Sequence, residues 1–114
     1  MTIEHISRDG VVVIAPSGRI DTTTSGAVEE AIRRSVDGGT RDLVIDFAQV
    51  EYISSAGLRV FLVLAKRMRD LQGRLVLCAL PEPVRQVFRL AGFMPLFLIE
   101  PSRDTALAKL APQR

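Results

Sequence analysis

The chain has 114 residues, 47% of them hydrophobic and 25% charged, which is the composition of one folded domain and excludes a disordered chain. Its 15 basic and 13 acidic residues give a formal net charge of +2, so charge alone predicts no binding to nucleic acid or to a membrane surface. We expect residues 1–114 to form a single domain.

Strands and helices alternate along the predicted chain. β-Branched runs on either side of Asp9-Gly10 indicate an N-terminal hairpin, and segments with apolar residues at helical spacing separate the later strands. The expected strands cover residues 3–6, 11–16, 43–47, 74–80 and 97–99, and the expected helices cover residues 27–36, 55–71, 83–92 and 102–110. Between residues 48 and 54 we expect no regular structure. This order predicts an α/β fold with a mixed, mainly parallel β-sheet, an N-terminal β-hairpin and four α-helices.

The sequence also limits the chemistry that the chain can carry. Cys78 is the only cysteine, which excludes an intramolecular disulfide and metal sites built from two or four cysteines, and its apolar neighbours predict a buried, unreactive thiol. No segment approaches the ~20 apolar residues that a membrane span needs, and the N-terminus lacks the pattern of a secretion signal. We therefore expect a cytoplasmic protein with no metal and no other cofactor.

The second predicted helix has two different faces. Its buried face is expected to consist of Leu58, Phe61, Leu62, Ala65 and Met68, which recur at helical spacing. The same spacing places four residues on the opposite side, namely Arg59, Val60, Val63 and Arg67. Two exposed valines between arginines indicate a surface for a partner protein, unless another helix covers them.

Two adjacent serines, Ser54 and Ser55, stand where this helix begins. A serine at such a position commonly caps the helix by accepting a hydrogen bond from a backbone N–H of the first turn. The alternative is that one hydroxyl accepts a phosphoryl group, because a helix N-terminus tolerates a phosphate. Gly57 in the first turn would then let a kinase or another partner approach the backbone closely.

Four separated segments of the chain resemble a known family. They are Gly18-Arg19-Ile20-Asp21; Asp46-Phe47 with Val50 and Tyr52-Ile53-Ser54-Ser55-Ala56-Gly57-Leu58; Gly73-Arg74-Leu75-Val76-Leu77-Cys78; and Pro83-Val84-Arg85-Gln86-Val87-Phe88 with Gly92-Phe93. In this order they are similar to the bacterial anti-sigma factor antagonists of the STAS domain family. The resemblance covers almost the whole chain and implies the STAS fold.

The resemblance implies a binding switch and not an enzyme. In this family an unphosphorylated antagonist binds an anti-sigma factor that is also a serine protein kinase, which releases its client sigma factor. The kinase ends the capture by phosphorylating one serine of the antagonist, and a PP2C-type serine phosphatase reverses the modification. The serine corresponds to Ser55, and Ser54 is the reserve candidate because it stands where many members have an aspartate.

The resemblance and the outer face of the second predicted helix together indicate a partner-binding surface around this serine. The segments that resemble the family contribute Asp21, Ser54, Ser55, Ala56 and Gly57, and the helical spacing adds Arg59, Val60 and Val63. Asp21 matches an acidic position that the family keeps near the serine. Because three threonines follow it, Asp21 is equally well placed to cap the first helix.

Two other functions stay open at this point. A hydrolase would use Ser54 or Ser55 as its nucleophile, but the only histidine, His5, lies on the first predicted strand and no G-x-S-x-G turn precedes the helix. A STAS module can instead bind a nucleotide or another small ligand, or act in a signalling complex that does not control transcription.

Overall fold

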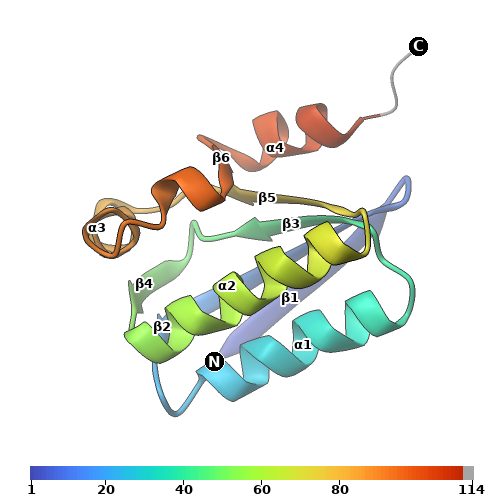
Figure 1. Ribbon diagram of the computed structural model, residues 1–114. Helices are drawn as coiled ribbons and strands as arrows, with labels where there is room; N and C mark the ends of the chain where they lie inside the picture. The colour runs from blue at the N-terminus through green and yellow to red at the C-terminus, as the bar shows by residue number, and fades with distance from the viewer. Residues whose placement is uncertain (112–114) are drawn as a thin grey trace.

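The structure is a computed structural model that describes residues 1–111, and these residues form six strands and four α-helices (Figure 1). The strands are β1 (Thr2–Arg8), β2 (Val11–Ile20), β3 (Asp42–Asp46), β4 (Val50–Ile53), β5 (Arg74–Cys78) and β6 (Leu98–Glu100). The helices are α1 (Ser25–Asp37), α2 (Ser55–Asp70), α3 (Glu82–Leu90) and α4 (Arg103–Leu110), with a short 3-10 turn at Met94–Leu96. The predicted alternation of strands and helices is confirmed.

The strands form one mixed sheet. Its order is β1-β2-β3-β5-β6, in which β1 is antiparallel to β2 and the remaining neighbours are parallel. The antiparallel pair is the predicted hairpin, and each parallel pair requires a crossover that a helix supplies. The α/β fold with a mainly parallel sheet and four helices is therefore confirmed.

The expectation that residues 48–54 are irregular is wrong. Val50–Ile53 form β4, which pairs in parallel with the last residues of β2. β2 has 10 residues and pairs with β3 only through Val11 to Ile14, so the backbone groups at its other end need a second partner. The two buried residues of β4 are Val50 and Ile53, and this spacing of three hides the alternation by which a strand is recognised in a sequence.

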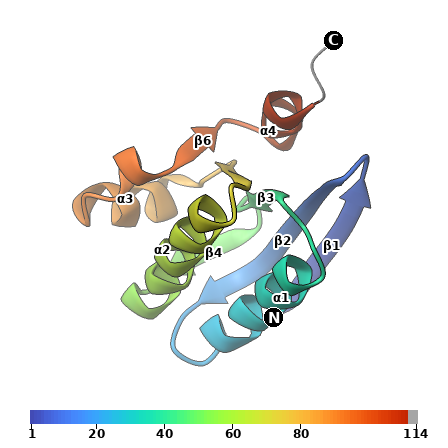
Figure 2. The same cartoon turned by 45° about the vertical axis from the view of Figure 1, so that its right-hand side comes forward.

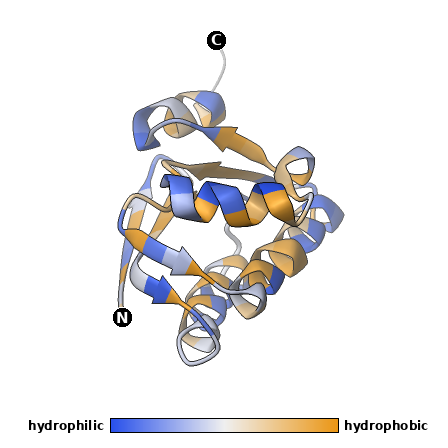
Figure 3. Ribbon diagram, turned by 90° about the vertical axis from the view of Figure 1, so that its left-hand side faces the viewer, coloured by the Kyte–Doolittle hydropathy of each residue, from blue (hydrophilic) through white to orange (hydrophobic). Residues whose placement is uncertain are grey.

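Helices cover both faces of the sheet (Figures 1 and 2). α1 and α2 lie side by side on one face, where α3 adds Phe88 to the larger core. At the centre of this core the ring of Phe47 lies 5.1 Å from that of Phe61 and 6.0 Å from that of Phe88, measured between ring centroids. Seen from the side of α3, hydrophilic and hydrophobic residues alternate along that helix, as expected for an element with one buried face (Figure 3).

α4 covers the opposite face and encloses a smaller core that contains Cys78. The expected burial of this cysteine is confirmed, because its relative exposure is 0%. Burial, together with the nearby negative charge of Asp46, raises the pKa of the Cys78 thiol to about 12. The thiol is therefore protonated at neutral pH, which makes it a poor nucleophile.

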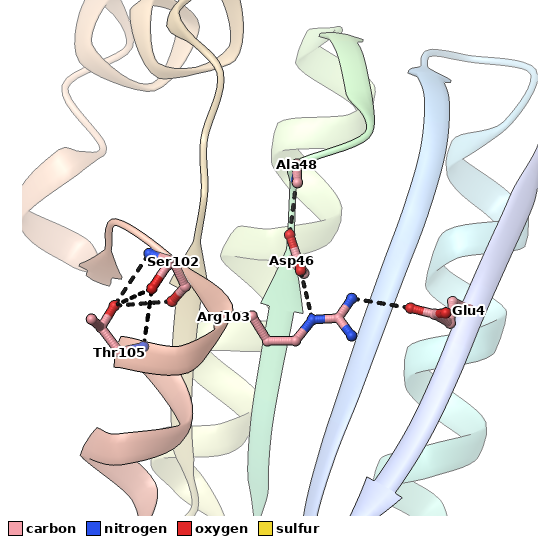
Figure 4. Close-up of polar contacts among 6 residues, drawn as sticks. All are labelled: Glu4, Asp46, Ala48, Ser102, Arg103 and Thr105. Atoms are coloured by element: carbon pink, nitrogen blue, oxygen red, sulfur yellow. Dashed lines mark hydrogen bonds and ion pairs between the residues drawn. The ribbon is translucent and has the colours of Figure 1, made fainter.

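An ion pair between the buried Asp46 and the half-buried Arg103 holds α4 against the sheet. Asp46, at the end of β3, is only 5% exposed, and its carboxylate accepts hydrogen bonds from the Ala48 backbone N–H at 2.9 Å and from Arg103 Nε at 2.8 Å. Arg103 Nη2 donates to Glu4 Oε1 at 3.0 Å, so one guanidinium bridges β3 and β1 (Figure 4). This bridge lies in the first turn of α4, whose start is also fixed by a capping box between Ser102 and Thr105.

We predict that Arg103→Met lowers the free energy of unfolding by about 1–3 kcal/mol, because it leaves the buried Asp46 carboxylate without its cationic partner. Glu4→Gln is the matched control, since it removes only the exposed arm of the bridge and should cost less than about 0.5 kcal/mol. Urea denaturation followed by circular dichroism measures both. Equal stability of the two variants would show that the pair between Arg103 and Asp46 does not hold α4.

Candidate functional site

The two serines at the start of α2 have different environments. Ser54 is the N-cap: its backbone is extended, with φ −90° and ψ 174°, and its Oγ accepts a hydrogen bond from the Gly57 backbone N–H at 3.2 Å. Ser55 is the first residue of the helix and its side chain is exposed. Among the described residues no hydrogen bond to the Ser55 hydroxyl is formed by another side chain or by the backbone. One serine therefore stabilises the helix, and the other is accessible for chemistry.

The pairing of β4 with β2 positions this helix start. Ile53 lies opposite Ile20, and the Ser54 backbone N–H donates to the Ile20 carbonyl oxygen at 2.8 Å. The Leu58 N–H then donates to the Ser54 carbonyl oxygen at 2.9 Å, which is the first helical hydrogen bond. The cap and the strand pairing together determine where α2 begins.

The expected role of Gly57 in letting a partner approach is wrong. Gly57 is buried, and a Cβ at this position would lie 2.8 Å from Ile20 Cγ2, 2.8 Å from Ile53 Cγ1 and 3.0 Å from the Ile20 carbonyl oxygen. The absent side chain thus allows α2 to pack directly on the ends of β2 and β4. Gly57 supports the site from inside and is not itself accessible to a partner.

Asp21 lies in the turn between β2 and α1, one residue beyond the Ile20 that binds Ser54. Its Oδ1 accepts hydrogen bonds from the Thr23 hydroxyl at 2.7 Å and from the Thr23 backbone N–H at 3.0 Å. These bonds, the one from the Thr23 hydroxyl above all, hold the pKa of the Asp21 carboxyl below its usual value, so the side chain is ionised at neutral pH. Thr24 and not Asp21 is the N-cap of α1, and Asp21 orders the turn that precedes it.

Arg19 is a second charged residue beside this turn, and the sequence did not reveal its contacts. The guanidinium carbon of Arg19 lies 4.4 Å from the centroid of the Tyr52 ring, and its Nε is 3.8 Å from Asp21 Oδ2. Arg19 and Tyr52 are opposite each other in the β2–β4 pair. This cation–π contact could not be predicted because it depends on β4, which the sequence pattern does not reveal.

The outer face of α2 is narrower than the helical pattern predicts. Val63 is 57% exposed and Arg59 is also exposed, as expected, but Val60 is only 8% exposed. α1 covers Val60, because α2 packs against both the sheet and α1 and therefore buries a wider arc of its surface. For the same reason Leu64 is buried, whereas Leu62 and Ala65, which were expected in the core, are half-buried.

Two shallow hollows lie between α1 and α2. One, of about 120 Å³, is lined by Ile32, Val60 and Leu64 among others, and the other, of about 220 Å³, includes Ala56, Arg59 and Glu29. Within residues 1–111 no three His, Cys, Asp or Glu side chains come together as metal ligands. Among the helices of this part of the chain, none is long and apolar enough to cross a membrane.

The only histidine of the sequence lies away from the two serines. His5 lies in β1, opposite Ile14, whereas the serines lie at the end of β4. The one side-chain hydrogen bond of the serine pair within the described residues is the cap between Ser54 and Gly57. Among the described residues the Ser55 hydroxyl is thus exposed and forms no hydrogen bond to the imidazole or carboxylate that would activate a serine nucleophile.

The family model of the STAS domain matches residues 2–106. The chain therefore belongs to the STAS domain family, as its motifs imply. BtrV of Bordetella bronchiseptica, which is named as a candidate anti-sigma factor antagonist, is 41% identical over 108 residues, or 95% of this chain and 91% of that protein.

Solved structures agree with this assignment. An anti-sigma factor antagonist from Mycobacterium paratuberculosis is 31% identical and has a TM-score of 0.87, with 95% of this chain and 92% of that chain covered. Bacillus SpoIIAA in its unphosphorylated form has a TM-score of 0.82 at 19% identity, with 96% of each chain covered. The second likeness shows that the two proteins share a fold.

We predict that Gly57→Ala destabilises the protein by about 1–3 kcal/mol, because the new methyl group would overlap Ile20 and Ile53 and the Ile20 backbone is fixed by strand pairing. Gly26→Ala is the matched control: it also lies in the first turn of a helix, but open space surrounds its Cβ position, so alanine should be neutral or stabilising by up to about 1 kcal/mol. Chemical denaturation compares the two variants. A Gly57→Ala protein as stable as the wild type would mean that α2 does not need this close contact.

Proposed function

We propose that this protein is an anti-sigma factor antagonist that works by partner switching. Unphosphorylated protein binds an anti-sigma factor that is also a serine kinase and thereby frees the client sigma factor. Phosphorylation of Ser55 ends this binding, and a PP2C-type phosphatase restores it. The observation that carries the proposal is the exposed Ser55 hydroxyl at the start of α2, in a family whose relatives are named as anti-sigma factor antagonists.

The division of work between the two serines favours Ser55 as the acceptor. Ser54 Oγ holds the cap, and its side chain is half-buried, so a phosphate there would remove a hydrogen bond that the helix needs. Within residues 1–111 the Ser55 hydroxyl forms no cap hydrogen bond. A phosphate on it would lie near the free backbone N–H groups at the positive end of α2. The helix can therefore accept the modification without unfolding, and Ser54 stays the reserve candidate.

Likeness to SpoIIAA supports the idea that the fold tolerates a phosphate. Its phosphorylated form has a TM-score of 0.75 to this chain, compared with 0.82 for the unphosphorylated form, so both forms share this fold. A phosphoserine adds about 1.5 to 2 negative charges at neutral pH. At the edge of an interface that excludes water, this charge and bulk are enough to prevent docking while the domain stays folded.

The proposed docking surface surrounds Ser55. Its accessible members are Asp21, Ser54, Ser55, Ala56, Arg59 and Val63. Two other residues that the sequence analysis expects there, Gly57 and Val60, are buried and support the surface from inside. We propose that the protein acts in the cytoplasm, where its kinase and phosphatase would have access to it, and that it uses no nucleic acid or membrane partner.

The test is phosphorylation by the candidate kinase, for which we take the serine kinase encoded nearest to this protein. Wild type, Ser55→Ala and Ser54→Asp are incubated with kinase and ATP and analysed by intact-mass and peptide mass spectrometry. Ser54→Asp is the matched control because aspartate keeps an N-cap acceptor but cannot be phosphorylated by a serine kinase. We expect one phosphate on wild type and on Ser54→Asp, and none on Ser55→Ala.

Other results would lead to different conclusions. If the Ser55→Ala protein is phosphorylated and the Ser54→Asp protein is not, the acceptor is Ser54. If neither serine is modified while the protein binds a nucleotide in calorimetry, the fold assignment stands and the phosphorylation switch is wrong.

A further inference from the structure

Arg59 is an exposed cation one helical turn after Ser55. The two residues are the first and fifth of α2, and both side chains are exposed. Residues four apart on a helix have Cβ atoms about 5–6 Å apart on the same face. Any group attached to Ser55 Oγ is therefore within reach of the Arg59 guanidinium.

Arg59 also has no acidic partner in the part of the chain that the structure describes. On the same helix Arg67 pairs with Asp37, and at the neighbouring turn Arg19 is held between Asp21 and the Tyr52 ring. By contrast, no ion pair within 4.0 Å involves Arg59. Its guanidinium is available for a new anion.

The other charged groups near Arg59 are already engaged elsewhere or form no ion pair with it among the described residues. Glu29 of α1 lines the same hollow as Arg59 but forms no ion pair with it. Glu51 of β4 is exposed, and Asp21, in the turn between β2 and α1, accepts hydrogen bonds from the Thr23 and Thr24 hydroxyls. Arg19 is a second cation on this side of the molecule, and to bind a phosphate on Ser55 it would first have to leave Asp21 and Tyr52.

We propose that Arg59 is the intramolecular partner of the phosphate on Ser55. This inference rests on the proposed modification of Ser55 and names the residue that responds to it. The negatively charged phosphate on Ser55 would precede the positively charged Arg59 by four residues. This is the favourable order for an ion pair on a helix. The planar guanidinium can bind two phosphate oxygens at once, which a lysine cannot do.

The pair would make phosphorylation change two features of the docking surface together. Before modification, Arg59 offers a free positive charge beside the exposed Val63. After modification, the phosphate occupies Arg59, so a partner loses that cation as well as meeting the new negative charge. Because both residues belong to one helix, this change requires only side-chain rotation.

The test uses full-length protein with phosphoserine incorporated at position 55 during synthesis, so it needs no kinase. A phosphorus NMR titration measures the second pKa of the phosphate in the Arg59→Gln, Arg59→Lys, Arg19→Gln and Arg69→Gln proteins and in the otherwise unchanged chain. Arg69 is the matched control because it is an exposed arginine of α2 that lies 14 residues from Ser55, about 21 Å along the helix.

We expect Arg59→Gln to raise this pKa by about 0.3, because a neighbouring guanidinium stabilises the dianion. Arg59→Lys should restore part of the difference, and Arg69→Gln should leave the pKa unchanged. An unchanged pKa in Arg59→Gln, or an increase confined to Arg19→Gln, would overturn the assignment of Arg59. Because the phosphate is present from the start, this result is independent of whether a kinase modifies Ser55.

Discussion

The contact between the start of α2 and the carboxyl end of β2 is the constraint on which the site depends. Ile20 lies opposite Ile53 in the strand pair, and its carbonyl oxygen accepts the Ser54 N–H. Gly57 lets the first turn of the helix pack against the same residue. With the backbone fixed at these points, Ser55 must begin the helix with its side chain in solvent. The exposed hydroxyl is thus a consequence of strand pairing and close packing.

This arrangement separates the residues that stabilise the fold from those for which we propose a regulatory role. Ser54 and Gly57 serve the fold, whereas Ser55 and Arg59 are exposed and can change state without loss of a buried contact. The ion pair that secures α4, through Asp46, lies on the opposite face of the sheet from α2. A charge added at Ser55 would therefore act mainly on the surface of the molecule, which is what the proposed partner switching requires.

Local patterns in the sequence were sufficient for much of this structure. Helical spacing and turn residues predicted the four helices, the hairpin and the central strands, and the two serines predicted a cap at the start of α2. What the pattern missed depends on contacts distant along the chain. β4 is short and pairs with the carboxyl end of β2, and α1 covers Val60. Asp46 forms an ion pair with Arg103, which is 57 residues away along the chain. The role of Gly57 was misjudged because only the fold shows that Ile20 lies beneath it.

The most direct test of the account is the affinity of the serine kinase for the unphosphorylated protein and for the same chain with phosphoserine at position 55, measured by calorimetry at one salt concentration. The account predicts that the phosphate weakens binding at least ~100-fold, since it places a charge of about −2 within the docking surface. Equal affinity of the two forms would contradict it, because Ser55 would then be a modified residue without control over partner choice.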